Sequence, residues 1–256
     1  MRLLLTNDDG IDSPGIAALA AAVAELGEVT VVAPDREQSA ASHAITLSRP
    51  LRVQTLGERR FAVDGTPTDC VYLALNHLLK DARPDLVVSG INKGSNLADD
   101  VTYSGTVAAA VEAAMLGVPS FAISLAARPP WNFGPAARFA RALAAEIGNG
   151  KIALPPQTLL NVNVPPRADV SRFAWTRLGR RSYGNMVEER RDPRGRSYYW
   201  IGGDELMHQN IPGSDCNALV DGGMISVTPL HLDVTAHGLL DAFSALSLPG
   251  FERGTV

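Results

Sequence analysis

The stretch Met1-Arg2-Leu3-Leu4-Leu5-Thr6-Asn7-Asp8-Asp9-Gly10 decides how the rest of the chain is interpreted. Its apolar half predicts a short buried strand over residues 2–6 and is too short for the apolar region of a secretory signal. Its polar half comes where that strand ends, and Gly10 allows the chain to turn there. Polar groups just beyond a buried strand are typical of α/β sheet proteins, which bind ligands at the carboxyl ends of their strands.

Three further β-rich apolar runs follow the first strand, and helical patterns separate them. They cover residues 28–33, 85–91 and 119–125. The helices are expected to start at Ser13-Pro14, at Thr66 and at about Ser104, all residue types that cap helices. Strands that alternate with helices predict a mostly parallel sheet with helices on both faces. We therefore expect an α/β fold, a Rossmann-like three-layer sandwich.

The composition changes after the α/β pattern ends. We interpret residues 1–256 as a single domain with an α/β core over 1–165 and a returning strand and C-terminal helix over 223–256. Between them, residues 166–222 contain many arginines, glycine turns and an aromatic run at 198–200. Such a segment predicts an extended β-hairpin arm that projects from the core and is used in oligomerisation.

Composition and charge exclude several classes of protein. With 46% apolar and 20% charged residues the chain lacks the signature of a disordered protein, and its net charge of −4 gives no basic field for a nucleic acid duplex. Cys70 and Cys216 are too few for a disulfide scaffold. No run approaches the roughly 20 apolar residues that cross a bilayer, so we expect no membrane partner and a cytoplasmic location.

Four polar stretches are expected to meet at one edge of the sheet, because each follows a strand or opens a helix there. They are residues 7–10, 34–39, 92–96 and 103–106. In a regular strand Asp8 and Asp9 would point to opposite faces, but a turn at Gly10 lets both carboxylates face one cation. Without histidine or cysteine nearby, these oxygens suit Mg²⁺, Mn²⁺ or Ca²⁺ better than Zn²⁺. The alternative is a plain turn in which the same side chains only satisfy backbone donors.

The other polar groups also have simpler interpretations. Ser104, Gly105 and Thr106 open a helix and offer the N–H groups and hydroxyls that bind phosphate, although a serine at this place is more often only an N-cap. His43 is a candidate for donating a proton to a leaving group, and the alternative is a solvated histidine in a polar loop. Asp233 and His237 lie four residues apart, and a structural hydrogen bond is the favoured interpretation for that pair.

Seven motifs in order resemble the SurE family, the stationary-phase survival proteins E, which are 5′/3′-nucleotidases. The motifs are LTNDDGI (5–11), APDREQS (33–39), GTPTDCV (65–71), SGINKGSN (89–96), YSGTVAAA (103–110), DPRGR (192–196) followed by YYW, and VTPLH (227–231). The resemblance covers nearly the whole chain, and residues 126–160 match least.

The resemblance implies a set of site residues. It assigns the metal to Asp8, Asp9, Ser39 and Asn92, with one divalent cation per subunit, Mg²⁺ or Mn²⁺ in first place and Ca²⁺ as an alternative. It assigns the phosphate to Asn96, Ser104, Gly105 and Thr106. It also implies a homodimer or homotetramer built through the arm.

The implied reaction is hydrolysis of a nucleoside 5′-monophosphate to nucleoside and phosphate, with 3′-monophosphates and short polyphosphate as further substrates to test. The cation would polarise the phosphoryl group and activate a water. Asp8 or Asp9 would act as the catalytic base, and attack by an aspartate on phosphorus stays open.

Three other functions compete with hydrolysis by this route. A non-catalytic nucleotide-binding sensor would use the same metal cleft. A haloacid-dehalogenase-type phosphatase would need aspartates two positions apart after the first strand, and here they are adjacent. A dinucleotide-binding oxidoreductase would need Gly-x-Gly-x-x-Gly there, whereas residues 8–15 contain only Gly10 and Gly15.

Overall fold

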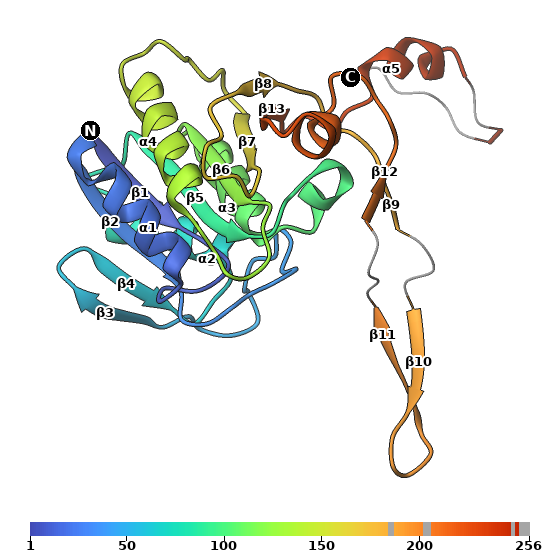
Figure 1. Cartoon of the computed structure of the whole chain (residues 1–256), viewed down its shortest axis with the longest axis horizontal. Helices are drawn as coiled ribbons and strands as arrows, with labels where there is room; N and C mark the ends of the chain where they lie inside the picture. Colours follow the sequence, from blue (N-terminus) through green and yellow to red (C-terminus); the bar gives the residue numbers. More distant parts are fainter. Residues whose placement is uncertain (184–186, 202–205, 247–248, 251–256) are drawn as a thin grey trace.

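The structure, a computed structural model, describes residues 1–183, 187–201, 206–246 and 249–250. Within them, nine strands form the main sheet in the order β3-β4-β2-β1-β5-β6-β7-β13-β8 (Figure 1). The strands are β1 (Arg2–Thr6), β2 (Glu28–Pro34), β3 (Val53–Gly57), β4 (Arg60–Val63), β5 (Leu86–Lys93), β6 (Ser120–Leu125), β7 (Thr158–Val164), β8 (Phe173–Trp175) and β13 (Ile225–His231).

The centre of the sheet is parallel, as the strand and helix alternation predicts. β1 lies between β2 and β5, and Leu5 pairs with Val31 on one side and Val88 on the other. β6 and β7 extend this parallel order, whereas β13 returns antiparallel to β7. The hairpin of β3 and β4 was not predicted, because all five residues of β3 are exposed and show no apolar run.

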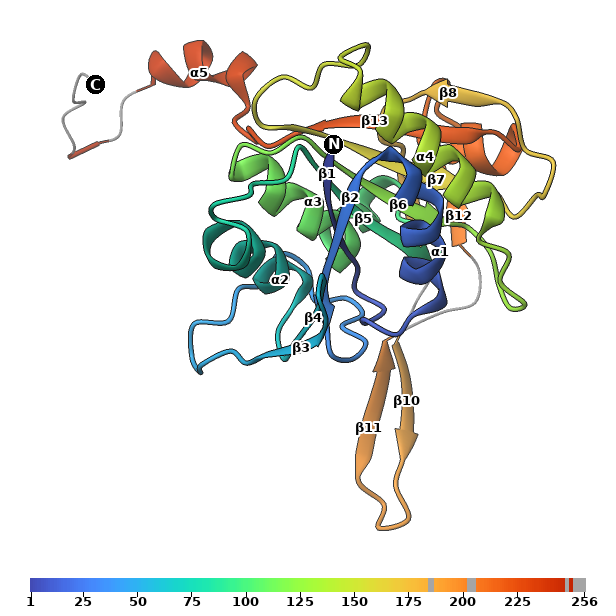
Figure 2. The same ribbon diagram turned by 90° about the vertical axis from the view of Figure 1, so that its left-hand side faces the viewer.

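Helices cover both faces of the sheet (Figure 2). On one face lie α1 (Pro14–Val23) and α4 (Gly134–Gly148), and on the other lie α2 (Pro67–Leu73) and α3 (Gly105–Met115). Leu3 and Leu5 pack in the cluster of α1 and α4, whereas Leu4 packs in the cluster of α2 and α3. Because successive strand residues point to opposite faces, a continuous apolar strand is buried on both sides. The three-layer α/β fold is thereby confirmed.

The predicted helix caps are present at all three positions. Ser13 accepts a hydrogen bond from the Gly15 N–H at 3.3 Å, and Ser104 accepts one from Val107 at 3.1 Å. Thr66 forms a capping box with Asp69. These side chains replace the missing partners of the first N–H groups and fix where each helix begins. Beyond α2 the chain continues in a π-helical turn, Ala74–Leu78.

The arm that projects from the body is shorter than the predicted range 166–222. It consists of β9 (Arg181–Tyr183) paired with β12 (Leu206–His208), and of β10 (Val187–Arg191) paired with β11 (Ser197–Ile201) (Figure 1). Inside the predicted range, β8 instead joins the main sheet beside β13, where Phe173 packs on Phe139 of α4. The turn Asn217–Asp221 also packs on the body through Leu219.

The last described helix, α5 (His237–Ser244), follows β13 and lies away from the sheet (Figure 2). It has no buried residue. Over the described part of the chain, the structure contains no helix whose length and apolar character would let it cross a membrane.

Candidate active site

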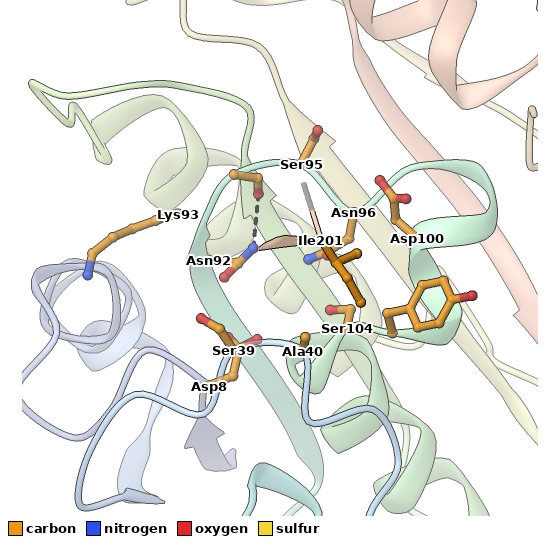
Figure 3. Close-up of a pocket in the computed structure, with 12 residues that line it drawn as sticks. Asp8, Ser39, Ala40, Asn92, Lys93, Ser95, Asn96, Asp100, Ser104 and Ile201 are labelled. Carbon is orange, nitrogen blue, oxygen red and sulfur yellow. Dashed lines mark hydrogen bonds between the residues drawn. The ribbon is translucent and has the colours of Figure 1, made fainter. Parts of the chain in front are cut away.

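The predicted site lies where the sheet changes its winding direction. The chain leads from β1 to β2 on one side of β1 and later returns to β5 on its other side. The loops after β1 and β5 therefore diverge and leave a crevice between them. A cavity of about 630 Å³ occupies this place (Figure 3). It is lined by Asp8, Ser39, Ala40, Asn92, Lys93, Gly94, Ser95, Asn96, Asp100, Tyr103, Ser104 and Ile201.

Asp8 connects the end of β1 to the start of α3. The Thr106 N–H donates to its Oδ2 at 3.1 Å, and the Thr106 hydroxyl donates to its Oδ1. Thr106 therefore holds Asp8 instead of presenting its hydroxyl to the cavity. A Cβ on Gly105 would lie 3.0 Å from the Cβ of Asp8 and 3.2 Å from Pro67 Cγ, so a side chain here would force one of these neighbours to shift.

The loops after β1 and β2 are fastened to each other. Gly10 adopts a left-handed φ of 97°, which glycine adopts without steric cost. The Gln38 N–H donates to the carbonyl of Asp8 at 2.7 Å, and the Ile11 N–H donates to the carbonyl of Pro34 at 2.8 Å. These bonds bring Ser39 to the same cavity as Asp8.

Asp9 is held from the other side of the crevice. The Lys93 N–H donates to its Oδ2 at 3.3 Å, and the Lys93 ammonium lies 3.5 Å from its Oδ1. Lys93 was not singled out from the sequence, although it directly follows Asn92. Its ammonium offsets part of the negative charge that the two adjacent aspartates bring into the crevice.

Burial raises the pKa of both aspartates. For Asp8 the pKa rises to about 6, chiefly because the carboxylate loses contact with water and, to a smaller extent, because Asp9 is a like charge. The hydrogen bonds from Thr106 act in the opposite direction. The pKa of Asp9 is also raised by burial, against the lowering effect of Lys93. Two buried carboxylates whose charged forms are disfavoured in this way form a place where a cation would be stabilising.

The raised pKa of Asp8 predicts a pH dependence of stability for the metal-free protein. The folded protein binds this proton more tightly than the unfolded chain, so the contribution of Asp8 to stability is fully present below about pH 4 and is lost as the pH rises through about 6, a change of about 3 kcal/mol at most. Asp8→Asn removes this contribution. Urea unfolding in EDTA between about pH 4 and pH 7 should show a steeper loss for the wild type than for Asp8→Asn, and equal slopes would contradict the assignment.

Ser39 and Asn92 add two further oxygen atoms that could bind a cation at the crevice. The amide nitrogen of Asn92 donates to the carbonyl of Gly94 at 3.0 Å, which directs its oxygen toward Asp8 and Ser39 (Figure 3). The Ser39 hydroxyl donates to Glu37 at 2.5 Å and keeps its lone pairs as acceptors. Among the described residues no three His, Cys, Asp or Glu side chains gather around a common point. A cation here therefore depends on amide and hydroxyl oxygens as well as on the aspartates.

Asn96 rests on a buried polar network that the sequence interpretation missed. Its N–H donates to the Asn163 side chain at 2.7 Å, its carbonyl accepts from Asn161 and Asn163, and its amide donates to Ser124 at 2.8 Å. The signal was present as two asparagines at alternate positions of the otherwise apolar strand β7. Buried polar groups of this kind persist when they are hydrogen-bonded, and they fix the loop that carries Asn96.

Several weaker candidates lie elsewhere. His43 does not line the cavity and instead bonds to Glu112 on α3. Asp233 and His237 form an exposed pair at 2.5 Å, as the structural interpretation expected. The arginine-rich segment contributes Arg181, which pairs with Asp100 at the cavity wall.

Ile201, at the end of β11, is a lining residue that no local pattern could have revealed. It lies 98 residues after Tyr103 in the chain, and only the return of the arm brings both to one cavity. Figure 3 shows the side chain of Ile201 between those of Asn96 and Ser104.

Comparisons with known proteins agree with this architecture. The family model "Survival protein SurE" matches residues 3–185. Curated relatives named "5′-nucleotidase SurE" include one from Myxococcus xanthus, 59% identical over 98% of this chain and 95% of its own, and one from Anaeromyxobacter dehalogenans, 57% identical over 99% and 98%. The crystal structure of the SurE protein from Aquifex aeolicus superposes with a TM-score of 0.85 at 41% identity, over 95% of this chain and 98% of that one. The chain belongs to the SurE family.

Proposed function

We propose that this chain is a divalent-cation-dependent phosphomonoesterase that hydrolyses nucleoside 5′-monophosphates to nucleoside and phosphate. The names of its relatives support assignment to the 5′-nucleotidases. The observation that carries the proposal is that Asp8, Ser39 and Asn92, from three separate segments of the chain, line one cavity together with the N-cap of α3.

Asp8, Asp9, Ser39 and Asn92 would hold one cation per subunit. Their oxygen atoms suit Mg²⁺ or Mn²⁺ best, with Ca²⁺ as the alternative. When bound, the cation would polarise the phosphoryl oxygens and lower the pKa of a water molecule. The buried carboxylates fit this role because a positive charge relieves both their loss of hydration and their mutual repulsion.

The phosphate would lie against Asn96, Ser104 and the first turn of α3. An eleven-residue helix directs the positive end of its dipole there, which favours an anion. Gly105 and Thr106 would contribute indirectly, because they keep Asp8 close to the start of α3, where the phosphate would bind. The cavity also reaches Tyr103 and Ile201, which leaves room for the nucleoside beside the phosphate.

Asp8 or Asp9 would accept the proton of the attacking water. A carboxylate with a raised pKa is a stronger base than an ordinary aspartate, and Asp8 meets that condition most clearly. The alternative, attack by an aspartate on phosphorus, would leave a phosphorylated protein. Acid quenching of a reaction with ³²P-labelled nucleotide separates the routes, since only that alternative retains label on the chain.

The experiment that tests the proposal is a substrate panel of 5′-AMP, 5′-GMP, 3′-AMP and tripolyphosphate with Mg²⁺, Mn²⁺ or Ca²⁺. Release of phosphate from the 5′-nucleotides is expected. A nucleotide sensor would instead bind 5′-AMP in calorimetry without turnover with any of the three cations, and that outcome would refute the enzymatic role. The same panel decides whether 3′-nucleotides and polyphosphate are substrates.

We also propose that the arm joins subunits of a dimer or tetramer. Val187, Tyr199, Trp200 and Ile201 of the β10–β11 hairpin are exposed. A two-stranded hairpin is marginally stable in water by itself, so contact with a second subunit would stabilise it. Light scattering of the chain should give a multiple of the 27.1 kDa subunit mass, and the mass of a single subunit would contradict the proposal.

A further inference from the structure

A segment that we name the strap, residues 38–46, brings Ser39 and Ala40 to the cavity and continues past α3 to the start of α2. It contains no helix or strand, so its place depends on contacts with its surroundings. The strap leaves the cavity after Ala40, and its later residues lie against α3 and the start of α2, which carry no proposed cation ligand. The contacts that hold the residues after Ala40 in place therefore also determine the position of Ser39.

Residues 42–46, the part of the strap beyond the cavity, are hydrogen-bonded to the body at both ends. Near the cavity, the Ser42 N–H donates to the carbonyl of Tyr103 at 3.1 Å and its hydroxyl donates to that of Thr102 at 2.7 Å. At the far end, the N–H and hydroxyl of Thr46 donate to Asp69 at 2.8 and 2.6 Å. The Thr66 hydroxyl donates to the carbonyl of Ala44 at 2.7 Å.

His43 makes the middle contact, with a residue of α3. Its Nε2 lies 2.8 Å from Oε2 of Glu112, to which it donates as the Nε2–H tautomer or as the imidazolium. The Glu112 side chain is only 9% exposed and is the one charged group of this alanine-rich helix. A carboxylate in such a place is costly unless it is hydrogen-bonded. The pair therefore ties the strap to the helix that also holds Asp8 through Thr106.

The backbone of the strap is strained where it enters the cavity. Ala40 and Ser42 have φ values of 56° and 52°, in the left-handed region that L-residues with a side chain avoid. Such conformations persist when the surroundings impose them, and they gather at functional sites. Loss of one of the hydrogen bonds that hold the strap would let Ala40 and Ser42 relax toward ordinary backbone angles, and this relaxation would move Ser39.

We propose that Glu112, acting through His43, is a positioning residue that holds the strap in the conformation in which Ser39 reaches the cation site. This inference rests on the proposed function, because it takes Ser39 as a ligand. Neither Glu112 nor His43 lines the cavity. Their effect on the cation is therefore indirect and passes through the strap.

The test compares Glu112→Ala, His43→Ala and Glu112→Gln with wild type in two measurements. Hydrogen exchange of peptides covering residues 38–46 reports the strap, and calorimetry of Mn²⁺ binding to the metal-stripped protein reports the site. In both alanine variants we expect faster exchange of the strap and a Kd for Mn²⁺ raised about 10-fold to 100-fold, as for other residues that orient metal ligands. Glu112→Gln keeps an oxygen that accepts from His43 and should restore both readouts.

Met115→Ala is the matched control, since Met115 is an exposed residue of the same helix and lies outside the strap. It should leave exchange and Mn²⁺ binding unchanged. If Glu112→Ala does not fold, His43→Ala provides the test. The His43 side chain is 35% exposed, so its removal should disturb the core less.

Wild-type strap exchange in the folded alanine variants would overturn the inference, as would faster exchange with unchanged Mn²⁺ affinity. A wild-type protein that binds no Mn²⁺ and releases no phosphate would instead refute the proposed function. Strap exchange distinguishes the two failures, because it is measured without metal or substrate.

Discussion

Asp9→Asn is expected to lower kcat/KM for 5′-AMP by about 1000-fold, which corresponds to about 4 kcal/mol of transition-state free energy. The substitution removes one of two carboxylate charges from the proposed cation site and keeps the size of the side chain. It also leaves the Lys93 ammonium, now 3.5 Å from Asp9, without its partner. An unpaired positive charge beside the site would repel the cation as well as fail to bind it.

Asp12→Asn is the control for this experiment, because Asp12 lies in the same loop, is exposed and pairs with Arg60 at 2.6 Å. Exposed ion pairs contribute little, so this variant should retain wild-type activity. Steady-state kinetics with Mn²⁺ and a thermal unfolding scan of both variants make the comparison. A folded Asp9→Asn protein with activity within about tenfold of wild type would show that Asp9 is not part of the catalytic site.

Gly105→Ala is expected to lower kcat/KM about 10-fold to 100-fold while the protein stays folded, because small displacements at a catalytic group are costly. The added methyl group would lie 3.0 Å from Asp8 Cβ, 3.2 Å from Pro67 Cγ and 3.3 Å from Asp8 Oδ2. Either Asp8 or the start of α3 must therefore shift. That shift loosens the two hydrogen bonds that Thr106 donates to Asp8.

Alanine is a better helix former than glycine, so Gly105→Ala separates geometry at the site from helix stability. Gly238→Ala is its matched control, since Gly238 lies in α5 with no atom near the position of an added Cβ. Gly238→Ala should leave kcat and KM unchanged. Wild-type kinetics for Gly105→Ala would contradict the importance of the close approach between α3 and Asp8.

The core of the fold follows from local signals in the sequence. The buried strand β1 contains a continuous apolar run, and α1, α2 and α3 begin at capping residues that retain their function in the structure. The exposed strand β3 and the three-residue strand β8 lack such signals, because pairing with a neighbouring strand stabilises them more than their own sequence does.

Only the site residues that lie at the ends of strands could be predicted from the sequence. The position of Asp8, Ser39 and Asn92 around one cavity follows from the topology of a parallel sheet. The partners of these residues do not follow from it. That Thr106 bonds to Asp8, and that Lys93 pairs with Asp9, depends on side-chain packing between elements far apart in the chain.

The most direct test of the account is phosphate release from 5′-AMP by the purified protein before and after removal of metal. We expect turnover with Mn²⁺, no turnover in excess EDTA, and recovery when Mn²⁺ is added back after EDTA is removed, because the four proposed oxygen ligands would hold the cation only by coordination. Undiminished phosphate release in EDTA would contradict the cation-dependent mechanism, and an absence of phosphate release with Mn²⁺, Mg²⁺ and Ca²⁺ would contradict the nucleotidase function itself.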